Sequence, residues 1–380
     1  MAGLYLHIPF CQAICSYCNF TRGLLDEAVK AQYVAALVAD LHRHAEPVDI
    51  ETIYLGGGTP SLLTPAELAA ILSACRTSFA VAADAEITLE ANPESVTAAS
   101  LAGYRAAGAN RLSFGAQSFR AEELVRLGRL HGPERPAEAM ALARAAGFNN
   151  LSLDLMLWLP GQTLAHARES VDRLIGIGPD HASLYLLEIY PNAPLREEMA
   201  RAGWSVAPDD DAADMYLEAM ATLDAAGYRQ YEISNVSRPG RESRHNLIYW
   251  CDGDWLAFGS GASGARGETR WRNVAGTSDY ITRVRDGVST VAERTPRDDR
   301  TRAEEALFMG LRLAEGINLA WMRQRYGVDV WTRYGAALAP FERAGHLVHE
   351  PGQRIRLTRQ GMLVANEAMS VFIAGEFPVE

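Results

Sequence analysis

Several features that define whole classes of protein are missing from this sequence. Lysine is nearly absent, because Lys30 is the only one and all the others among the 36 basic residues are arginines. No apolar run reaches the roughly 18 residues of a membrane-spanning helix, which excludes a span. Five cysteines in 380 residues are too few for a disulfide framework. The net charge of −11 disfavours a protein that binds nucleic acid irrespective of sequence, since such binding needs a basic surface.

What is present is typical of a globular protein with a sizeable core. Hydrophobic residues make up 48% of the chain and charged residues 22%. At about 150 residues per domain, the length suggests two or three domains. The N-terminus has neither the charged segment nor the apolar core of a secretory signal. We therefore expect a cytoplasmic protein with reduced cysteines.

Strands and helices alternate along the first part of the chain. The apolar run 3–8 predicts a strand, and residues 26–44 have the apolar spacing of an amphipathic helix. Residues 52–55 predict a buried strand that ends in three glycines. A helix over 64–79 then begins with a threonine cap, a first-turn proline and a capping-box glutamate. The next predicted strand is 86–90.

The order helix, glycine, strand then recurs three times. Gly108, Gly147 and Gly178 each follow a helical segment and precede an apolar strand. A glycine just past a helix suits the left-handed conformation that ends many helices. Six strands that alternate with helices predict an α/β fold with a parallel sheet, either open or curled into a barrel.

The alternation weakens after about residue 229. Residues 229–276 are rich in glycine, arginine, asparagine and tryptophan and predict long loops with short strands, while the polar stretch 286–300 predicts a linker. The tail combines helical spacing with a hairpin at Pro351-Gly352, which suggests a small winged-helix-like module. Its nine arginines against nine acidic residues leave no charge excess for DNA binding. The predicted domains are 1–228, 229–300 and 301–380.

Three of the five cysteines lie within eight residues, as Cys11, Cys15 and Cys18. Thiolates are soft ligands that suit iron–sulfur clusters, zinc or copper. Structural zinc needs four protein ligands, and His7 is the nearest candidate for the fourth. Three thiolates would instead leave one iron of a cubane cluster without a protein ligand, and that iron is a place where a substrate can bind.

The cysteines stand among motifs that together resemble one superfamily. The segment from Tyr5 to Cys11, the CxxxCxxC spacing and Tyr17 before the last cysteine look like the radical S-adenosylmethionine (radical SAM) superfamily. Within it, the chain resembles the oxygen-independent coproporphyrinogen dehydrogenases and their HemW-type haem-chaperone relatives. The resemblance covers nearly the whole chain and implies a partial (β/α)6 barrel. Further matching motifs are GGGTP at 56–60, EANP at 90–93, GAQSF at 115–119, and Asp154 followed by LPGQT at 159–163.

The resemblance also implies cofactors and the residues that hold them. It assigns a [4Fe-4S] cluster to Cys11, Cys15 and Cys18, with SAM bound at the iron that lacks a cysteine. Glycines at the end of the second strand are expected to let the backbone approach SAM closely, because they lack a Cβ atom. The implied SAM contacts are Tyr5, Gly57, Gly58, Thr59, Glu90, Gln117, Arg129 and Asp154.

Two departures from the dehydrogenases favour the chaperone branch. The dehydrogenases carry a further cysteine where this chain has Phe20, and an N-terminal arm precedes their barrel, whereas here the first strand is expected near residue 3. The HNxxYW motif at 245–250 also matches the chaperones. From the spacing of this stretch we expect His245 to ligate haem iron, which an axial histidine commonly holds. Tyr249 and Trp250 are expected to pack against the porphyrin, Arg244 to pair with a propionate, and Asn246 to be a further haem contact.

Three functions remain open at this stage. The leading one is a haem chaperone that carries the cluster and SAM and delivers haem to respiratory proteins, possibly at the membrane surface. It would have no catalytic residues of a dehydrogenase, would bind no nucleic acid, and is compatible with a homodimer. The second is an oxygen-independent coproporphyrinogen III dehydrogenase, which forms protoporphyrinogen IX by means of a 5′-deoxyadenosyl radical. The third is a radical SAM enzyme with an unrelated substrate.

Overall fold

The computed structural model describes residues 2–191 and 193–373 and contains one large mixed sheet. Six strands of this sheet are parallel and neighbours in chain order, as the sequence predicts. They are β1 (Ala2–Ile8), β4 (Asp49–Gly57), β5 (Ala80–Ala91), β6 (Arg111–Gln117), β7 (Leu151–Leu157) and β8 (His181–Leu186). The sheet does not close into a barrel, because β1 pairs with β11 (Asp254–Phe258) at one side and β8 pairs with β10 (Asn235–Ser237) at the other. The predicted α/β partial barrel is thus confirmed.

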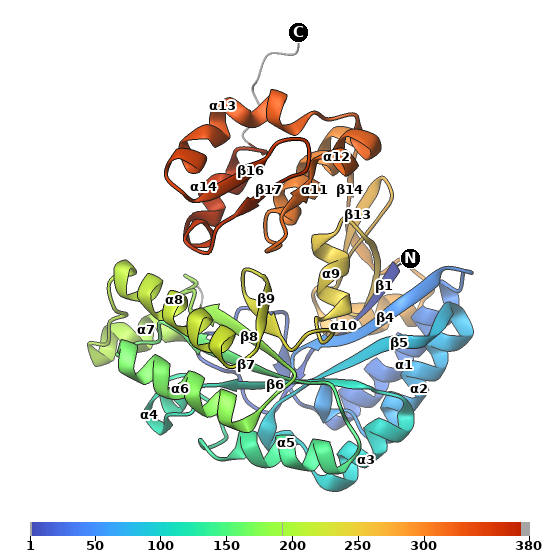
Figure 1. Cartoon of the computed structure of the whole chain (residues 1–380). Helices are drawn as coiled ribbons and strands as arrows, with labels where there is room; N and C mark the ends of the chain where they lie inside the picture. The colour runs from blue at the N-terminus through green and yellow to red at the C-terminus, as the bar shows by residue number, and fades with distance from the viewer. Residues whose placement is uncertain (1, 192, 374–380) are drawn as a thin grey trace.

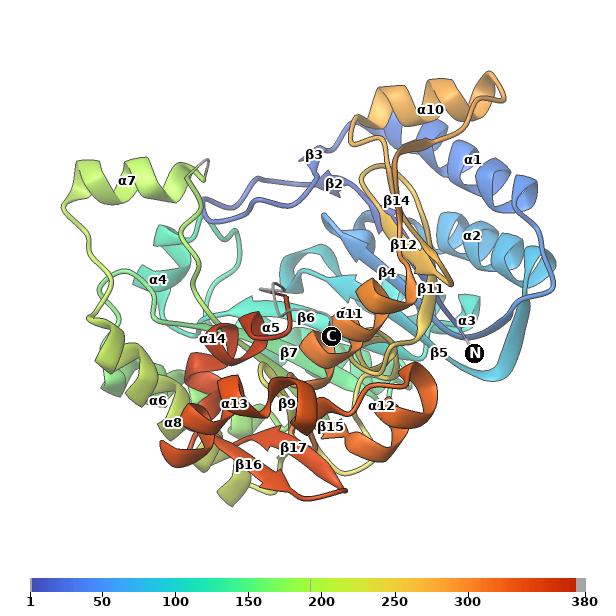
Figure 2. The same cartoon turned by 90° about the horizontal axis from the view of Figure 1, so that it is seen from above.

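Helices between the strands cover the outer face of the curved sheet (Figure 1). They begin and end where the sequence places caps: Thr64 forms a capping box with Glu67, and Gly108 and Gly178 end their helices in the left-handed conformation. Strands β6 and β7 are almost wholly buried, since the helices cover one face and the barrel interior the other. These helices are α1 (Glu27–Arg43), α2 (Pro65–Ser78), α3 (Ala98–Ala107), α4 (Ala121–Arg126), α5 (Arg135–Ala145), α6 (Leu164–Ile177) and α8 (Asp209–Ala225). A further helix, α7 (Pro194–Ala202), projects from the sheet (Figure 2).

The middle segment extends the sheet rather than hanging from it as loops. Next to β11, three antiparallel strands continue the sheet, and a short helix α9 (Arg244–Trp250) packs beside β1 and β4. The predicted linker 286–300 is wrong over part of its length, because it contains the edge strand β14. The side chains of 292–296 are all exposed, so no apolar alternation marked this strand in the sequence. The new elements are β9 (Arg229–Glu232), β12 (Ser263–Arg266), β13 (Thr269–Asn273), α10 (Thr277–Arg285) and β14 (Val291–Pro296).

The C-terminal part is a separate small α+β module that stands above the large sheet (Figure 1). The predicted hairpin at Pro351-Gly352 is confirmed, and with β15 it forms a three-stranded sheet that helices cover, as in a winged helix. Arg312 joins the module to the barrel by an ion pair of 3.0 Å with the buried Glu232. No helix in the described part of the chain is long and apolar enough to cross a membrane. The module comprises α11 (Asp299–Gly310), β15 (Ile317–Asn318), α12 (Leu319–Tyr326), α13 (Val330–Arg343), β16 (Leu347–Glu350), β17 (Arg354–Leu357) and α14 (Ala365–Ser370).

Candidate functional site

A cavity of about 370 Å³ opens at the carboxyl ends of the parallel strands. In a parallel α/β barrel this end collects the residues that follow each strand, so it is where sites are built. Each strand from β4 to β8 contributes to the lining. The contributing residues include Gly57, Gly58 and Thr59 at the end of β4, Glu90 in β5, Gln117 in β6, Asp154 in β7 and Tyr185 in β8.

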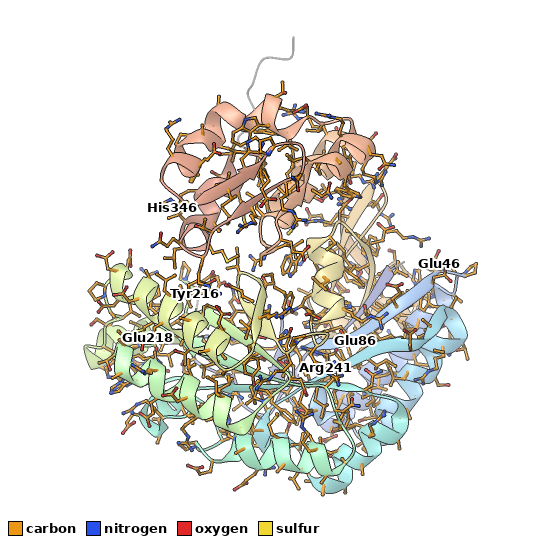
Figure 3. The ribbon with its side chains drawn as sticks, in the orientation of Figure 1. Glu46, Glu86, Tyr216, Glu218, Arg241 and His346 are labelled. Atoms are coloured by element: carbon orange, nitrogen blue, oxygen red, sulfur yellow. The ribbon has the colours of Figure 1, made fainter. Side chains whose placement is uncertain are left out.

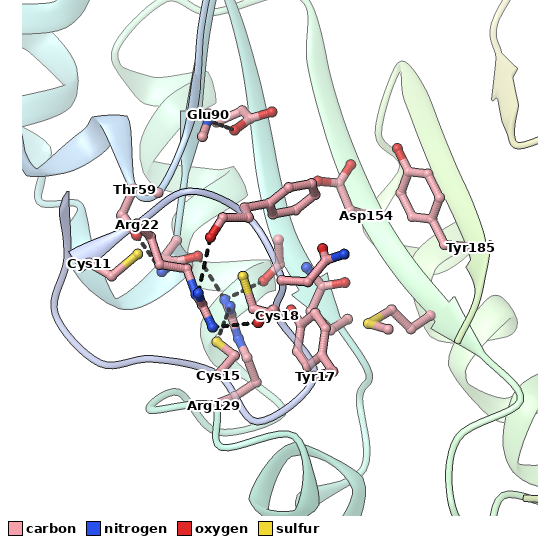
Figure 4. Close-up of a pocket in the computed structure, with 18 of the residues that line it drawn as sticks. Cys11, Cys15, Tyr17, Cys18, Arg22, Thr59, Glu90, Arg129, Asp154 and Tyr185 are labelled. Carbon is pink, nitrogen blue, oxygen red and sulfur yellow. Dashed lines mark hydrogen bonds between the residues drawn. The ribbon is translucent and has the colours of Figure 1, made fainter. Parts of the chain in front are cut away.

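The cysteine-bearing loop forms the remaining wall of this cavity. Cys11, Cys15 and Cys18 are all free of disulfides and all line the cavity, and Figure 4 shows them on one loop that surrounds it. The backbone N–H of Ser16 donates to the Leu127 carbonyl at 3.1 Å, and its hydroxyl donates to the Arg126 carbonyl at 2.8 Å. These bonds fix the loop to the segment after α4, which places the three thiols around one space.

Arg129 brings a positive charge to the cysteines. Its Nη1 lies 3.4 Å from the Cys15 sulfur, while Nη2 donates to Asn92 Oδ1 and to the Gly115 carbonyl, both at 2.8 Å. Burial raises the pKa of the Cys11 and Cys18 thiols, so both are protonated at neutral pH when no metal is bound. Binding of iron would therefore release protons, as is usual for cysteine ligands.

Two carboxyl groups face the cysteines across the cavity (Figure 4). Glu90 accepts hydrogen bonds from the Tyr54 hydroxyl at 2.7 Å and from the Gly57 N–H at 3.1 Å, and burial raises its pKa to about 7. Asp154 accepts a hydrogen bond from the Ser113 hydroxyl at 3.2 Å, and burial raises its pKa as well. Such a pair can accept hydrogen bonds from hydroxyl groups and can balance a cationic ligand.

The glycines after β4 are required by packing within the chain. Gly57 has φ +116°, and a Cβ atom there would lie 2.4 Å from the His7 ring. A Cβ atom on Gly58 would lie 2.6 Å from the Phe10 carbonyl oxygen. The close approach is therefore made to the strand that carries the cysteine loop. The predicted contact of these glycines with SAM stays a prediction, although both line the cavity.

The structure brings together nearly all of the residues predicted for the cluster and SAM. Tyr5 is the exception, because it is not part of the cavity lining. Its hydroxyl lies 3.1 Å from His7 Nδ1, and its ring stacks on Tyr54 at 6.2 Å between centroids. Tyr5 thus sits one layer behind the site. The predicted residues that share the cavity are Cys11, Cys15, Cys18, Gly57, Gly58, Thr59, Glu90, Gln117, Arg129 and Asp154.

Sequence reasoning missed several residues that line the same cavity, among them Arg22, Ser113 and Tyr185. Strand pairing places Ser113 opposite Glu90, and Tyr185 opposite Met156, two residues beyond Asp154. The period of two along a strand would have marked these positions once the neighbouring strands were in register. Register is a tertiary property, so no local signal identified them.

The predicted haem motif lies elsewhere, on α9 beside the opposite ends of the strands. His245 is 1% exposed, with Nδ1 2.6 Å from the Thr52 hydroxyl and Nε2 2.7 Å from the Tyr249 hydroxyl. Its backbone N–H donates to the carboxylate of Glu86, which Figure 3 labels below α9. The ring also stacks on Tyr54 at 5.0 Å between centroids. Burial lowers the pKa of His245 to about 3, so the imidazole is neutral.

Ligation of haem iron by His245 therefore stays a prediction, and the structure encloses the imidazole. Neither nitrogen of His245 is free in the structure, so ligation of haem would require α9 to move. Arg244 Nη1 donates to the Asp84 carbonyl at 2.9 Å, and the guanidinium of Arg312 covers the Trp250 ring at 4.4 Å. The haem roles of Asn246, Tyr249 and their neighbours on α9 stay predictions.

The fold and the cavity together define a class of protein. Three free cysteines surround a cavity at the carboxyl edge of a partial α/β barrel, as the resemblance implied. The model of the Radical SAM superfamily matches residues 5–174, and that of the HemN C-terminal domain matches residues 298–364. The chain is thus a radical SAM protein, and this superfamily implies a [4Fe-4S] cluster and SAM.

Curated relatives narrow the class to one family. Over 378 residues, the chain is 33% identical to the protein named heme chaperone HemW of Bacillus subtilis. The match covers 98% of this chain and 99% of the relative. It is 38% identical to the HemW protein of Mycobacterium tuberculosis, over 98% of this chain and 94% of the relative. It is 42% identical to that of Escherichia coli, over 69% of each chain. The chain belongs to the HemW family.

A solved structure shares the whole architecture. Coproporphyrinogen III oxidase (HemN) from Escherichia coli, described as a radical SAM enzyme, superposes with a TM-score of 0.87. The match covers 98% of this chain and 89% of the solved one at 24% sequence identity. At this identity the likeness concerns the fold, and it includes both the partial barrel and the C-terminal module.

Proposed function

We propose that this protein is a haem chaperone that holds a [4Fe-4S] cluster on Cys11, Cys15 and Cys18 and binds SAM beside it. The observation that carries the proposal is the meeting of three free thiols and two carboxyl groups in one cavity of a HemW-family chain. Thiolates suit iron, and three of them match the donor set of a cluster with one open iron.

Residues of the cavity have separate roles in this proposal. Glu90 and Asp154 accept hydrogen bonds from the nucleoside and balance the positive charge of the SAM sulfonium. Arg129 lies against the Cys15 sulfur and there stabilises the negative charge of a thiolate-bound cluster. When bound, the cluster would supply one-electron chemistry at the open iron.

The chaperone function would end in delivery of haem. We extend the proposal to respiratory proteins as acceptors, to the cytoplasm as the location, and to the membrane surface as the place of transfer. The relatives in Bacillus subtilis and Mycobacterium tuberculosis are named heme chaperones and match nearly the whole length of this chain. These matches support a role as a haem chaperone.

The alternative function is that of the dehydrogenase. The shared architecture with HemN favours it. Against it stands Phe20, which occupies the position of the dehydrogenases' further cysteine and lies at the cavity with 64% of its surface exposed. An exposed phenyl ring offers neither a proton nor a ligand to a substrate.

One anaerobic experiment separates these functions. The reconstituted full chain is titrated with haem, and the same sample is assayed with SAM, reductant and coproporphyrinogen III. We expect haem binding without formation of protoporphyrinogen. Turnover without haem binding would replace the chaperone by the dehydrogenase.

Cysteine variants test the cluster in the same preparation. Replacing Cys11, Cys15 or Cys18 by alanine should abolish iron binding, because each change removes one of three protein ligands. The exposed Cys251→Ala is the matched control and should bind iron like the wild type. Stoichiometric zinc in place of iron would overturn the cluster assignment.

A further inference from the structure

A second cavity, of about 480 Å³, lies between the end of α1 and the β11–β14 extension of the sheet. One wall is the C-terminal end of α1 with the residues just after it, and the other is the extension from β11 to β14. Figure 2 shows these elements on the side of the molecule where α1 and α10 lie. None of the residues that line this cavity belongs to the first one. Its volume lies within the usual range for small-molecule and cofactor sites.

His44 in this cavity has the hydrogen bonding of a metal ligand. Its Nδ1 lies 3.0 Å from the Asp40 carbonyl oxygen and 3.2 Å from Oδ1 of the Asp40 carboxylate. Nδ1 therefore carries the proton, and in the neutral ring the lone pair is on Nε2. Within residues 2–191 and 193–373, no hydrogen bond engages Nε2. Metal-ligating histidines almost always donate their other ring N–H to a carboxylate or a carbonyl in this manner.

Asp40 is a rigid support for that imidazole. The carboxylate is 1% exposed, and Oδ2 accepts a hydrogen bond of 2.7 Å from the buried Tyr280 hydroxyl. Oδ1 makes no other hydrogen bond in the described chain, so His44 is its one close polar neighbour. The side chain of His44 is 53% exposed and lines the cavity.

Aromatic side chains line the same space. The ring of Phe258 meets that of His44 edge to face at 5.8 Å between centroids. Trp271 packs against Gly264, where a Cβ atom would lie 2.3 Å from the indole. The indole can occupy this position because Gly264 has no side chain. Flat apolar surfaces of this kind suit a flat aromatic ligand.

Two arginines complete the lining. Arg266 pairs with Glu46 at 2.6 Å, whereas Arg294 is exposed and forms no ion pair with any described residue. Guanidinium groups bind carboxylates in a bidentate fork, so this edge suits a ligand that carries carboxylates. The cavity thus combines a histidine whose Nε2 has no described partner, aromatic walls and one arginine without an ion pair.

We propose that this second cavity is the haem site and that His44 Nε2 is the axial ligand to the iron. The inference rests on the proposed chaperone function and assigns its cargo to a particular place. Haem binding then needs no movement of α9, and the cargo sits apart from the cysteine-lined cavity. Arg294 anchors one propionate.

The test is a titration of the reconstituted full chain with ferric haem and, in parallel, with metal-free protoporphyrin IX. The variants are His44→Ala, at the residue that caps α1, and, as a matched control in the last turn of that helix, His42→Ala. His44→Ala should shift the Soret band and lower the affinity for haem. Loss of an outer-shell partner lowers metal affinity by roughly 10–100-fold, and loss of the ligand itself should cost at least as much. Affinity for metal-free porphyrin should stay unchanged, because that ligand makes no bond to the imidazole.

Further arms separate this inference from the proposed function. Arg294→Ala should lower the affinity for both haem and metal-free protoporphyrin, since both carry propionates. Unchanged iron content and SAM binding in each variant would show that the barrel is intact. A His44→Ala variant with wild-type haem affinity and Soret band overturns the site while the chaperone function stands, and loss of the band in His245→Ala alone would move the ligand to α9. A wild-type chain that binds no haem overturns both.

Discussion

Glu90 makes the stability of the cofactor-free protein depend on pH near neutrality. Burial raises the pKa of this carboxyl to about 7 from an ordinary value of 4.5, although Tyr54 and the Gly57 N–H donate hydrogen bonds to it. The folded state therefore keeps the proton over a range in which the unfolded chain has lost it. Stability from this group is complete below pH 4.5 and is lost as the pH rises through 7.

The size of the effect follows from the shift. At about 1.36 kcal/mol per pKa unit, the shift corresponds to roughly 3 kcal/mol. Because the cavity opens to solvent, screening reduces this, and we expect a loss of about 1–3 kcal/mol between pH 5 and pH 8. Glu90→Gln retains an acceptor for the Gly57 N–H and has no charge to lose. Its free energy of unfolding should lack this component.

The assay is thermal unfolding of the cofactor-free protein across this pH range. The melting temperature of the wild type should fall relative to that of Glu90→Gln as the pH rises. Glu122→Gln, whose side chain is 69% exposed in the native protein, is the matched control and should follow the wild type. If the wild type and Glu90→Gln lose stability in parallel, the enclosed carboxyl is not the titrating group and the reasoning fails.

Three further outcomes are expected. Asp154→Ala should lower the affinity for SAM by about threefold to tenfold with unchanged iron content, because one hydrogen bond is worth about 0.5–1.5 kcal/mol. An affinity equal to that of the wild type in equilibrium binding would contradict the role of Asp154. His245→Ala should lower the free energy of unfolding by about 2–4 kcal/mol, since Thr52 and Tyr249 lose a buried partner and a void remains; urea denaturation measures this, and a stability equal to that of the wild type would refute it. Thr64→Ala should cost about 1 kcal/mol through loss of the helix cap, and an unchanged melting temperature would show the cap to be dispensable.

Local patterns in the sequence were sufficient for much of the fold. The caps at Thr64 and Gly108 and the hairpin at Pro351-Gly352 were predictable because each depends on a few adjacent residues. The cysteine spacing likewise marked the loop whose three free cysteines line the first cavity. A strand without apolar alternation, such as β14, gives no such signal, because backbone pairing with β13 is what defines it.

The sequence by itself determined the order of the six parallel strands and the helices between them, the cysteine-rich loop and the residues that end the parallel strands. Only the tertiary structure decided which side chains share a space. It buried His245 against Thr52, which lies 193 residues earlier, and it placed Arg129 against Cys15. It also joined the end of α1 to the β11–β14 extension and so left His44 with a free nitrogen in a cavity. Contacts between segments so far apart depend on how strands align and helices pack, and no local spacing in the sequence encodes them.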